Sequence, residues 1–149
     1  MRIEDELKGR FRNEYHKGFI NLSYTARRLN YDFFSELKRY GITEPQYNVL
    51  RILRGFRNEL SLTVGFIKER MLDRDSDVSR LVDRLQARGL VTSKHSTADR
   101  RQRSVEITPM GMELLDSILV WEKHIDTLLS NLSANEVIEL NRLLDKIRE

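Results

Sequence analysis

The chain has 149 residues, a length that suits one domain with its own core. Hydrophobic residues make up 40% and charged residues 33%, with seven glycines and two prolines, which indicates a helix-rich globular protein and excludes a disordered or fibrous one. The absence of cysteine excludes disulfides, thiolate metal sites and thiol redox sensing. Because no signal sequence or long apolar run is present, we expect a cytoplasmic protein with no membrane partner.

The net charge of +3 is unevenly distributed along the chain. Residues 68–103 hold ten basic and six acidic side chains, so this segment alone carries +4. Positive charge concentrated in one segment is typical of a surface that meets a polyanion. We therefore expect a nucleic-acid contact there.

Helical periodicity dominates the first third of the chain. Apolar spacing over residues 11–40 predicts one long helix that ends before Gly41. Thr43 with Gln46 three residues later gives a capping signal, and a second helix should run from there to about Arg54.

Two short helices separated by a polar turn are predicted next. A short extended stretch leads to the first, which Ser61 or Thr63 would cap. Asp75 would cap the second, which ends at Gly89. Four apolar side chains give this second helix one buried face: Val78, Leu81, Val82 and Leu85.

The remainder predicts a hairpin and two helices. Alternating side chains indicate strands over residues 90–94 and 103–108, joined by a polar loop. Thr108 followed by Pro109 starts a helix of about twenty residues. The last helix begins at a capping box formed by Ser133 and Glu136, and its apolar stripe is Val137, Leu140, Leu143, Leu144 and Ile147.

Two short helices followed directly by a hairpin are typical of a winged helix-turn-helix, whose second helix enters the DNA major groove. We predict a single domain over residues 1–149, mostly α-helical with a small β-hairpin wing, in which residues 43–108 form the winged helix-turn-helix. The flanking residues 1–40 and 109–149 carry more large apolar side chains than this part can cover. They therefore predict N- and C-terminal dimerisation helices and a homodimer.

The exposed face of the helix after Asp75 carries the candidate reading residues. Ser76 in the first turn would meet a phosphate, and Arg80 can hold a guanine edge through two hydrogen bonds. Asp77 and Asp83, three residues before and after Arg80, could orient its guanidinium. The candidate set is Ser76, Asp77, Ser79, Arg80 and Arg84. The alternative is that this side of the helix is an ordinary charged surface in contact with solvent.

The hairpin loop carries the second candidate set. An arginine on a wing can enter a narrow A·T-rich minor groove, and we assign this role to Arg101. Lys94, Arg100 and Arg103 would contact phosphates or steady the loop, and Asp99 would brace an arginine. The alternative is a loop tip without a defined structure.

The stretch LVDRLQARGLVTSKHSTADRRQRSVEITPMG resembles the signature of the multiple antibiotic resistance regulator (MarR) family of winged-helix transcription factors. The similar features are R-G-L-V after the recognition helix, D-x-R in the wing, and a junction like L-T-x-x-G. The resemblance implies a homodimer on a pseudo-palindromic operator, commonly as a repressor, with Asp99 and Arg101 as the wing pair. Asp75 and Asp77 stand where many members have proline and threonine, so the operator sequence does not carry over.

The resemblance further implies a small, often aromatic, anionic effector bound between the dimerisation helices and the winged part, which lowers DNA affinity. Candidate lining residues are Tyr15, Phe19, Tyr47 and Phe66. The alternative is that these aromatic side chains belong to the ordinary core.

Other functional classes find little support in the sequence. The three histidines are scattered, so we expect no metal site, and no nucleophile motif or glycine-rich phosphate loop indicates an enzyme or a cofactor. The remaining alternative is a winged helix that binds RNA or another protein without operator specificity.

Overall fold

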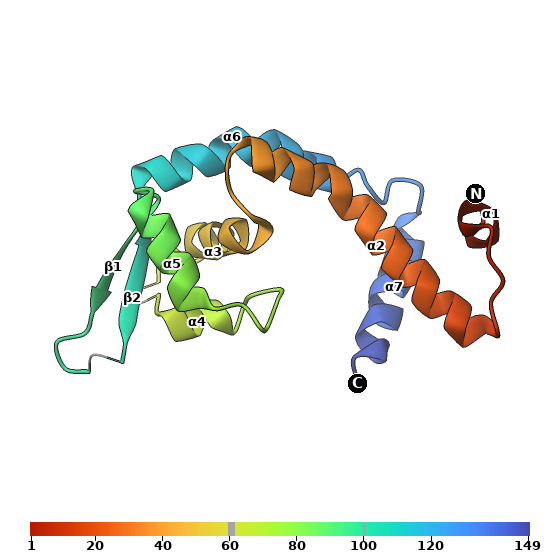
Figure 1. Ribbon diagram of the computed structural model, residues 1–149, viewed down its shortest axis with the longest axis horizontal. Helices are drawn as coiled ribbons and strands as arrows, with labels where there is room; N and C mark the ends of the chain where they lie inside the picture. Colours follow the sequence, from red (N-terminus) through yellow and green to blue (C-terminus); the bar gives the residue numbers. More distant parts are fainter. Residues whose placement is uncertain (60–61, 100) are drawn as a thin grey trace. The chain divides into compact units, whose positions relative to one another are not determined.

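The computed structural model describes residues 1–59, 62–99 and 101–149 (Figure 1). The chain divides into two units, Met1–Glu36 and Leu37–Glu149. Its elements are α1 (Ile3–Leu7), α2 (Glu14–Arg39), α3 (Glu44–Gly55), α4 (Val64–Lys68), α5 (Val78–Ala87), β1 (Val91–His95), β2 (Arg103–Ile107), α6 (Pro109–Ile125) and α7 (Ala134–Ile147). Within the described residues, no helix has both the length and the hydropathy needed to cross a membrane.

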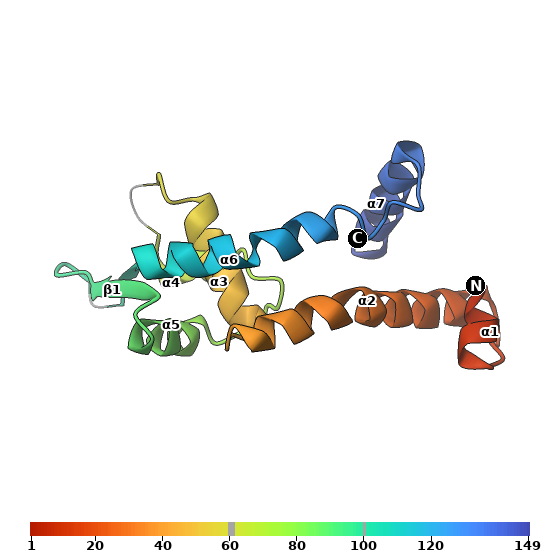
Figure 2. The same cartoon turned by 90° about the horizontal axis from the view of Figure 1, so that it is seen from above.

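The first unit consists of α1 and most of α2. Figure 2 shows α2 as one long helix, which confirms the prediction, although it begins at Glu14 and leaves Phe11 outside. The short helix α1 was not predicted. It is fastened to α2 by polar contacts: Lys17 Nζ lies 2.6 Å from Glu4 Oε1, and the Tyr24 hydroxyl donates to Glu6 Oε2 at 3.0 Å.

The second unit is built around α3. The predicted capping box is present, since the Thr43 side chain accepts from the Gln46 N–H and the Gln46 side chain accepts from the Thr43 N–H. Side chains fully withdrawn from solvent come from α3, α4, α5, β2 and α6: Val49, Leu50, Leu53, Ile67, Val82, Leu85, Val105, Leu115 and Ile118. This core holds the helix-turn-helix and the hairpin together.

The caps of α4 and α5 correct one prediction. Thr63 caps α4 by accepting from the Phe66 N–H at 3.1 Å, whereas Ser61 lies outside the described residues. Helix α5 starts at Val78, and its N-cap is Asp77, which accepts from the Arg80 N–H at 3.1 Å. The prediction of Asp75 as the cap is therefore wrong, because the helix begins two residues later, with its first buried apolar side chain.

The hairpin pairs β1 and β2 antiparallel, with Val91 opposite Ile107 and His95 opposite Arg103. Leu62 and Thr63, directly before α4, lie against β2: the Val105 N–H donates to the Leu62 carbonyl at 2.7 Å, and Thr63 forms a bridge with Ser104. The wing is thus anchored to the helix-turn-helix through the backbone.

The two last helices begin as predicted. Thr108 caps α6 by accepting from the Gly111 N–H at 3.1 Å, and Ser133 and Glu136 form the capping box of α7. Helix α6 is shorter than predicted: it ends at Ile125, and turns follow to the start of α7. Helix α7 has no buried residue among the described side chains.

Candidate nucleic-acid interface

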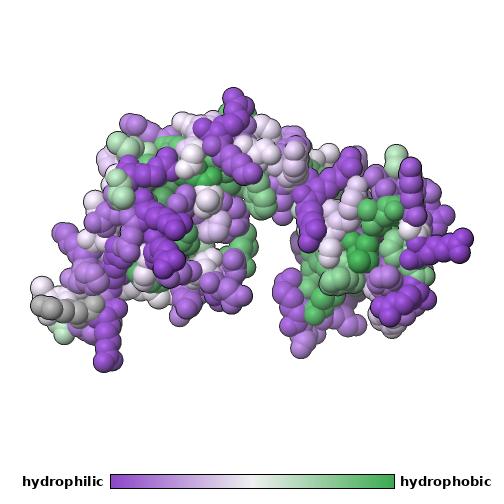
Figure 3. All heavy atoms as spheres, in the orientation of Figure 1, coloured by the Kyte–Doolittle hydropathy of each residue, from purple (hydrophilic) through white to green (hydrophobic). Residues whose placement is uncertain are grey.

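Helix α5 has one side packed in the core and a polar side exposed to solvent. Val78, Val82 and Leu85 are at most 2% exposed, so the inner side of the helix is fixed in the core. Ser79, Arg80 and Arg84 are exposed on the outer side. Hydrophilic side chains cover much of α5 and the hairpin in Figure 3. The arrangement leaves the polar face of α5 open to a macromolecular partner.

Ser76 and Asp77 lie differently from the prediction. Ser76 is in the turn before α5 rather than in its first turn, and its Oγ is buried with no hydrogen-bond partner in the described part of the chain. The Asp77 carboxylate accepts a hydrogen bond from the N-terminus of α5. This bond stabilises the helix, because the first N–H groups of a helix lack partners within it. Asp77 is therefore placed to fix the start of the helix.

The predicted orientation of Arg80 by two aspartates is wrong. Asp77 binds the backbone N–H of Arg80, not its guanidinium. Asp83 pairs instead with Arg103 of the wing. Arg80 and Arg84 make no ion pair with any described residue, which leaves their guanidinium groups available.

Arg103 joins the wing to the recognition helix. Its Nη2 lies 2.7 Å from Asp83 Oδ1, its Nε donates to Ser93 Oγ at 3.0 Å, and its Nη1 donates to the Ser79 carbonyl at 3.4 Å. The Arg103 side chain is only 13% exposed. Ser93 in turn donates to Gln86 Oε1 at 2.5 Å. Arg103 thus steadies the wing, which is one of the two roles predicted for it.

The wing loop is folded by its own polar groups. The Arg101 N–H donates to Asp99 Oδ1 at 2.9 Å, and the Gln102 N–H donates to the Asp99 carbonyl at 3.0 Å. Asp99 therefore holds Arg101 through its backbone. Lys94 and the side chain of Arg101 are exposed, whereas Arg100 lies outside the described residues.

Arg88 has a structural role that its charge did not reveal. Its Nη1 donates to the Gly41 carbonyl at 2.6 Å and its Nη2 to the Tyr40 carbonyl at 3.3 Å. Gly41 has φ +71°, a conformation that glycine adopts readily and that ends the preceding helix. Arg88 therefore ties the end of α5 to the turn between α2 and α3.

The four aromatic candidates for an effector pocket have different surroundings. Tyr47 donates its hydroxyl to Glu122 Oε1 at 2.5 Å. Phe66 packs edge-on against Phe56, with a centroid distance of 5.2 Å, and beneath the Arg70 guanidinium. Tyr15 and Phe19 are 91% and 67% exposed on α2. Core packing, the alternative, thus describes Tyr47 but not the two exposed residues.

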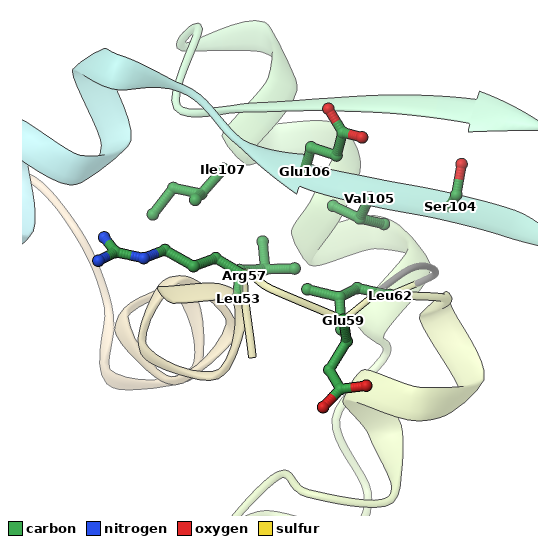
Figure 4. Close-up of a pocket in the computed structure, with 8 residues that line it drawn as sticks. All are labelled: Leu53, Arg57, Glu59, Leu62, Ser104, Val105, Glu106 and Ile107. Carbon is green, nitrogen blue, oxygen red and sulfur yellow. The ribbon is translucent and has the colours of Figure 1, made fainter. Parts of the chain in front are cut away.

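A hollow of about 420 Å³ lies between the end of α3 and β2 (Figure 4). It is lined by Leu53, Arg57, Glu59, Leu62, Ser104, Val105, Glu106 and Ile107. None of the four aromatic candidates lines it. Figure 4 shows the Glu59 and Glu106 carboxylates pointing in opposite directions, so they do not converge on one ligand. No group of three or more metal-binding side chains is found in the described part of the chain.

Known proteins share this arrangement. A model of the MarR family matches residues 40–102, which run from the turn before α3 to the wing loop. The HTH-type transcriptional repressor MdtR of Bacillus subtilis is 26% identical over 131 residues, which cover 87% of this chain and 83% of MdtR. The transcriptional regulator MhqR of the same organism is 27% identical, over 88% of this chain and 89% of its own. The chain is thus similar to the MarR family over residues 40–102, and to these two transcriptional regulators over most of its length.

Solved structures show the same MarR fold. BpsR of Bordetella bronchiseptica, whose DNA binding is regulated by 6-hydroxynicotinic acid, superposes with a TM-score of 0.75 at 23% identity, over 95% of this chain and 99% of that one. MepR of Staphylococcus aureus, solved with DNA, superposes with a TM-score of 0.75 at 20% identity, over 91% and 96%. The predicted mostly helical fold with a hairpin wing is confirmed.

Several contacts of this candidate interface were not predicted from the sequence. Gln86 and Ser93, which complete the network around Arg103, belong to two different elements, as do Arg88 and its partners. A polar residue on the flank of a recognition helix gives no sequence signal for a partner in the wing. The one available signal was Ser93, a polar residue within a strand, whose side chain could form a hydrogen bond with a neighbouring element.

Proposed function

We propose that this protein is a sequence-specific regulator of transcription that binds double-stranded DNA. The observation that carries the proposal is the contact of Arg103 with Asp83, Ser93 and Ser79, which holds the wing beside the recognition helix. A fixed wing and helix can engage a minor and a major groove of one duplex together. The curated relatives are named as transcriptional regulators, which supports the same function.

Within this proposal the candidate DNA-binding residues have separate roles. Ser79, Arg80 and Arg84 of α5 contact base edges and phosphates in the major groove, since arginine forms paired bonds with guanine. Arg101 enters the minor groove, and Lys94 and Arg100 meet the phosphates beside it. Ser76, Asp77, Asp99 and Arg103 act by shaping the two elements that carry these cations.

The active form in this proposal is a homodimer on a pseudo-palindromic operator, where it represses transcription. Helix α7 buries none of its side chains, and Leu143 and Ile147 on its apolar stripe are 44% and 69% exposed. Leu119 and Val120 of α6 are exposed as well. A second copy would cover these side chains, and twofold symmetry would present two recognition helices about 34–36 Å apart.

A small aromatic or anionic effector completes the proposal. 6-Hydroxynicotinic acid regulates DNA binding by BpsR, and that protein shares the fold of this chain. An effector that binds the free dimer more tightly than the DNA-bound dimer lowers operator affinity by the ratio of the two affinities.

The test is DNA binding by the purified protein, followed by fluorescence anisotropy at several salt concentrations. We expect tight binding to one duplex sequence, weak binding to others, and a fall in log affinity of about 0.9 per phosphate contact for each unit of log salt. Arg101→Ala should weaken operator binding at least about tenfold, whereas the control Arg142→Ala on α7 should not. Equal, weak binding to all duplexes, with tight binding to RNA or a protein, would favour the alternative function.

A further inference from the structure

Helix α6 leaves the core of the second unit at Glu122. Leu115 and Ile118, on its inner side, are fully buried, and Glu122 follows Ile118 by about one helical turn on the same side. Beyond this point Ile125 is 42% exposed, and α6 ends there. Within the described part of the chain, Glu122 is therefore the last residue of α6 whose side chain contacts α3.

Glu122 is held by two residues of α3. The Tyr47 hydroxyl donates to its Oε1 at 2.5 Å, and Arg54 Nη2 donates to Oε1 and Oε2 at 3.0 and 3.1 Å. Arg54 and Glu122 are only 24% and 17% exposed. Tyr47 and Arg54 lie two turns apart on the same side of α3, so the Glu122 carboxylate contacts that helix at two points.

Burial makes this contact more costly to break than a surface ion pair. Desolvation, followed by the hydrogen bond to Glu122, raises the pKa of the Tyr47 phenol well above its ordinary value, so the hydroxyl stays protonated and donates. The Glu122 carboxylate has hydrogen-bond partners when both the Tyr47 hydroxyl and the Arg54 guanidinium donate to it. Removing its charge would leave the Arg54 guanidinium half-buried without its partner.

We propose that Glu122 is a positioning residue for operator binding, because its bonds to Tyr47 and Arg54 fix the direction in which α6 leaves the winged part. This inference rests on the proposed function, in which the exposed end of α6 and helix α7 join the second copy. The direction of α6 then sets how far apart the two recognition helices stand. Glu122 would act on DNA without touching it.

The test separates binding of one recognition helix from binding of two. The probes are duplexes with the inverted repeat that the wild-type protein selects from random DNA, duplexes with one half-site, and duplexes with half-sites moved apart by single base pairs. We expect Glu122→Gln to lose at least about tenfold in affinity for the full repeat, to keep its half-site affinity, and to discriminate less between spacings. Tyr47→Phe, which keeps the ion pair, should show a smaller loss of the same kind.

The control Glu113→Gln removes the same charge from an exposed position of α6 and should bind like the wild type. The inference is overturned if Glu122→Gln keeps the wild-type spacing preference, or if it loses half-site and full-site affinity equally, as a merely destabilised protein would. If Glu122→Gln does not fold, the spacing preference of Tyr47→Phe decides in the same way. A wild-type protein that prefers no two-half-site duplex would instead contradict the proposed function.

Discussion

At the scale of single residues, one aspartate decides where the recognition helix begins. Asp73, Asp75 and Asp77 alternate before α5, and each is a good helix cap by type. Asp77 is the one used, because the next residue, Val78, is the first to enter the core. The other two side chains remain outside the helix, which is why the capping residue was ambiguous from sequence.

The capping role gives the first prediction. Asp77→Ala should lower the free energy of unfolding by about 1 kcal/mol, because the Arg80 N–H loses its acceptor. Asp77→Asn should retain most of the stability. Asp75→Ala, a control for the removal of an acid two residues away, should change stability by less than about 0.5 kcal/mol. Urea denaturation measures all three, and an equal loss in both alanine variants would contradict the assignment.

The ion pair between Asp83 and Arg103 gives the second prediction. Alanine substitutions at the two positions should be non-additive, with a coupling free energy of about 0.5–1 kcal/mol, because Asp83 is 65% exposed and the pair is partly solvated. A double-mutant cycle in urea measures the coupling. Asp83 with Arg84 is the control cycle, since neighbouring residues on a helix do not face each other. Additivity in the first cycle would show that the pair does not form in solution.

At the scale of elements, the sequence predicted the helices and strands that have periodic apolar side chains and local capping signals. Helices α3 and α7 and both strands appeared close to where apolar spacing and caps placed them, whereas α2 and α5 begin two or three residues later than predicted. Helix α1 was missed because it is five residues long and is held by polar contacts with α2. The contacts of Asp83, Arg88 and Glu122 were missed for another reason: each joins residues far apart in the chain, and charge type alone does not select the partner.

The junction of the wing with α6 gives the third prediction. A Cβ at Gly111 would lie 2.3 Å from the Leu90 carbonyl oxygen and 2.7 Å from Ile107 Cγ1, so the strands and the helix would have to separate. Gly111→Ala should therefore cost about 1–3 kcal/mol of unfolding free energy. Gly55→Ala, in open space at the end of α3, should be neutral or slightly stabilising. Thermal unfolding compares the two, and a tolerated alanine at 111 would contradict this packing.

At the scale of the whole molecule, the proposed homodimer uses the apolar stripe of α7 as part of its interface. Leu143→Asp places a charge within that stripe, so we expect the dimer to dissociate and operator binding to weaken at least about a hundredfold, because the second recognition helix is lost. Ile138→Asp makes a like substitution on the opposite, exposed face of α7 and should leave a dimer. Sedimentation velocity measures the assembly. A dimeric Leu143→Asp variant would show that the stripe is not the interface.

The central claim is that two copies of this chain present paired recognition helices and wings to one duplex. The most direct measurement is sequencing of the duplexes that the purified protein retains from a random pool. We expect one enriched inverted repeat, with half-site centres about 10–10.5 base pairs or a multiple apart and A·T-rich segments where the wings reach the minor groove. A retained pool without a shared sequence, or with a single unrepeated site, would contradict it.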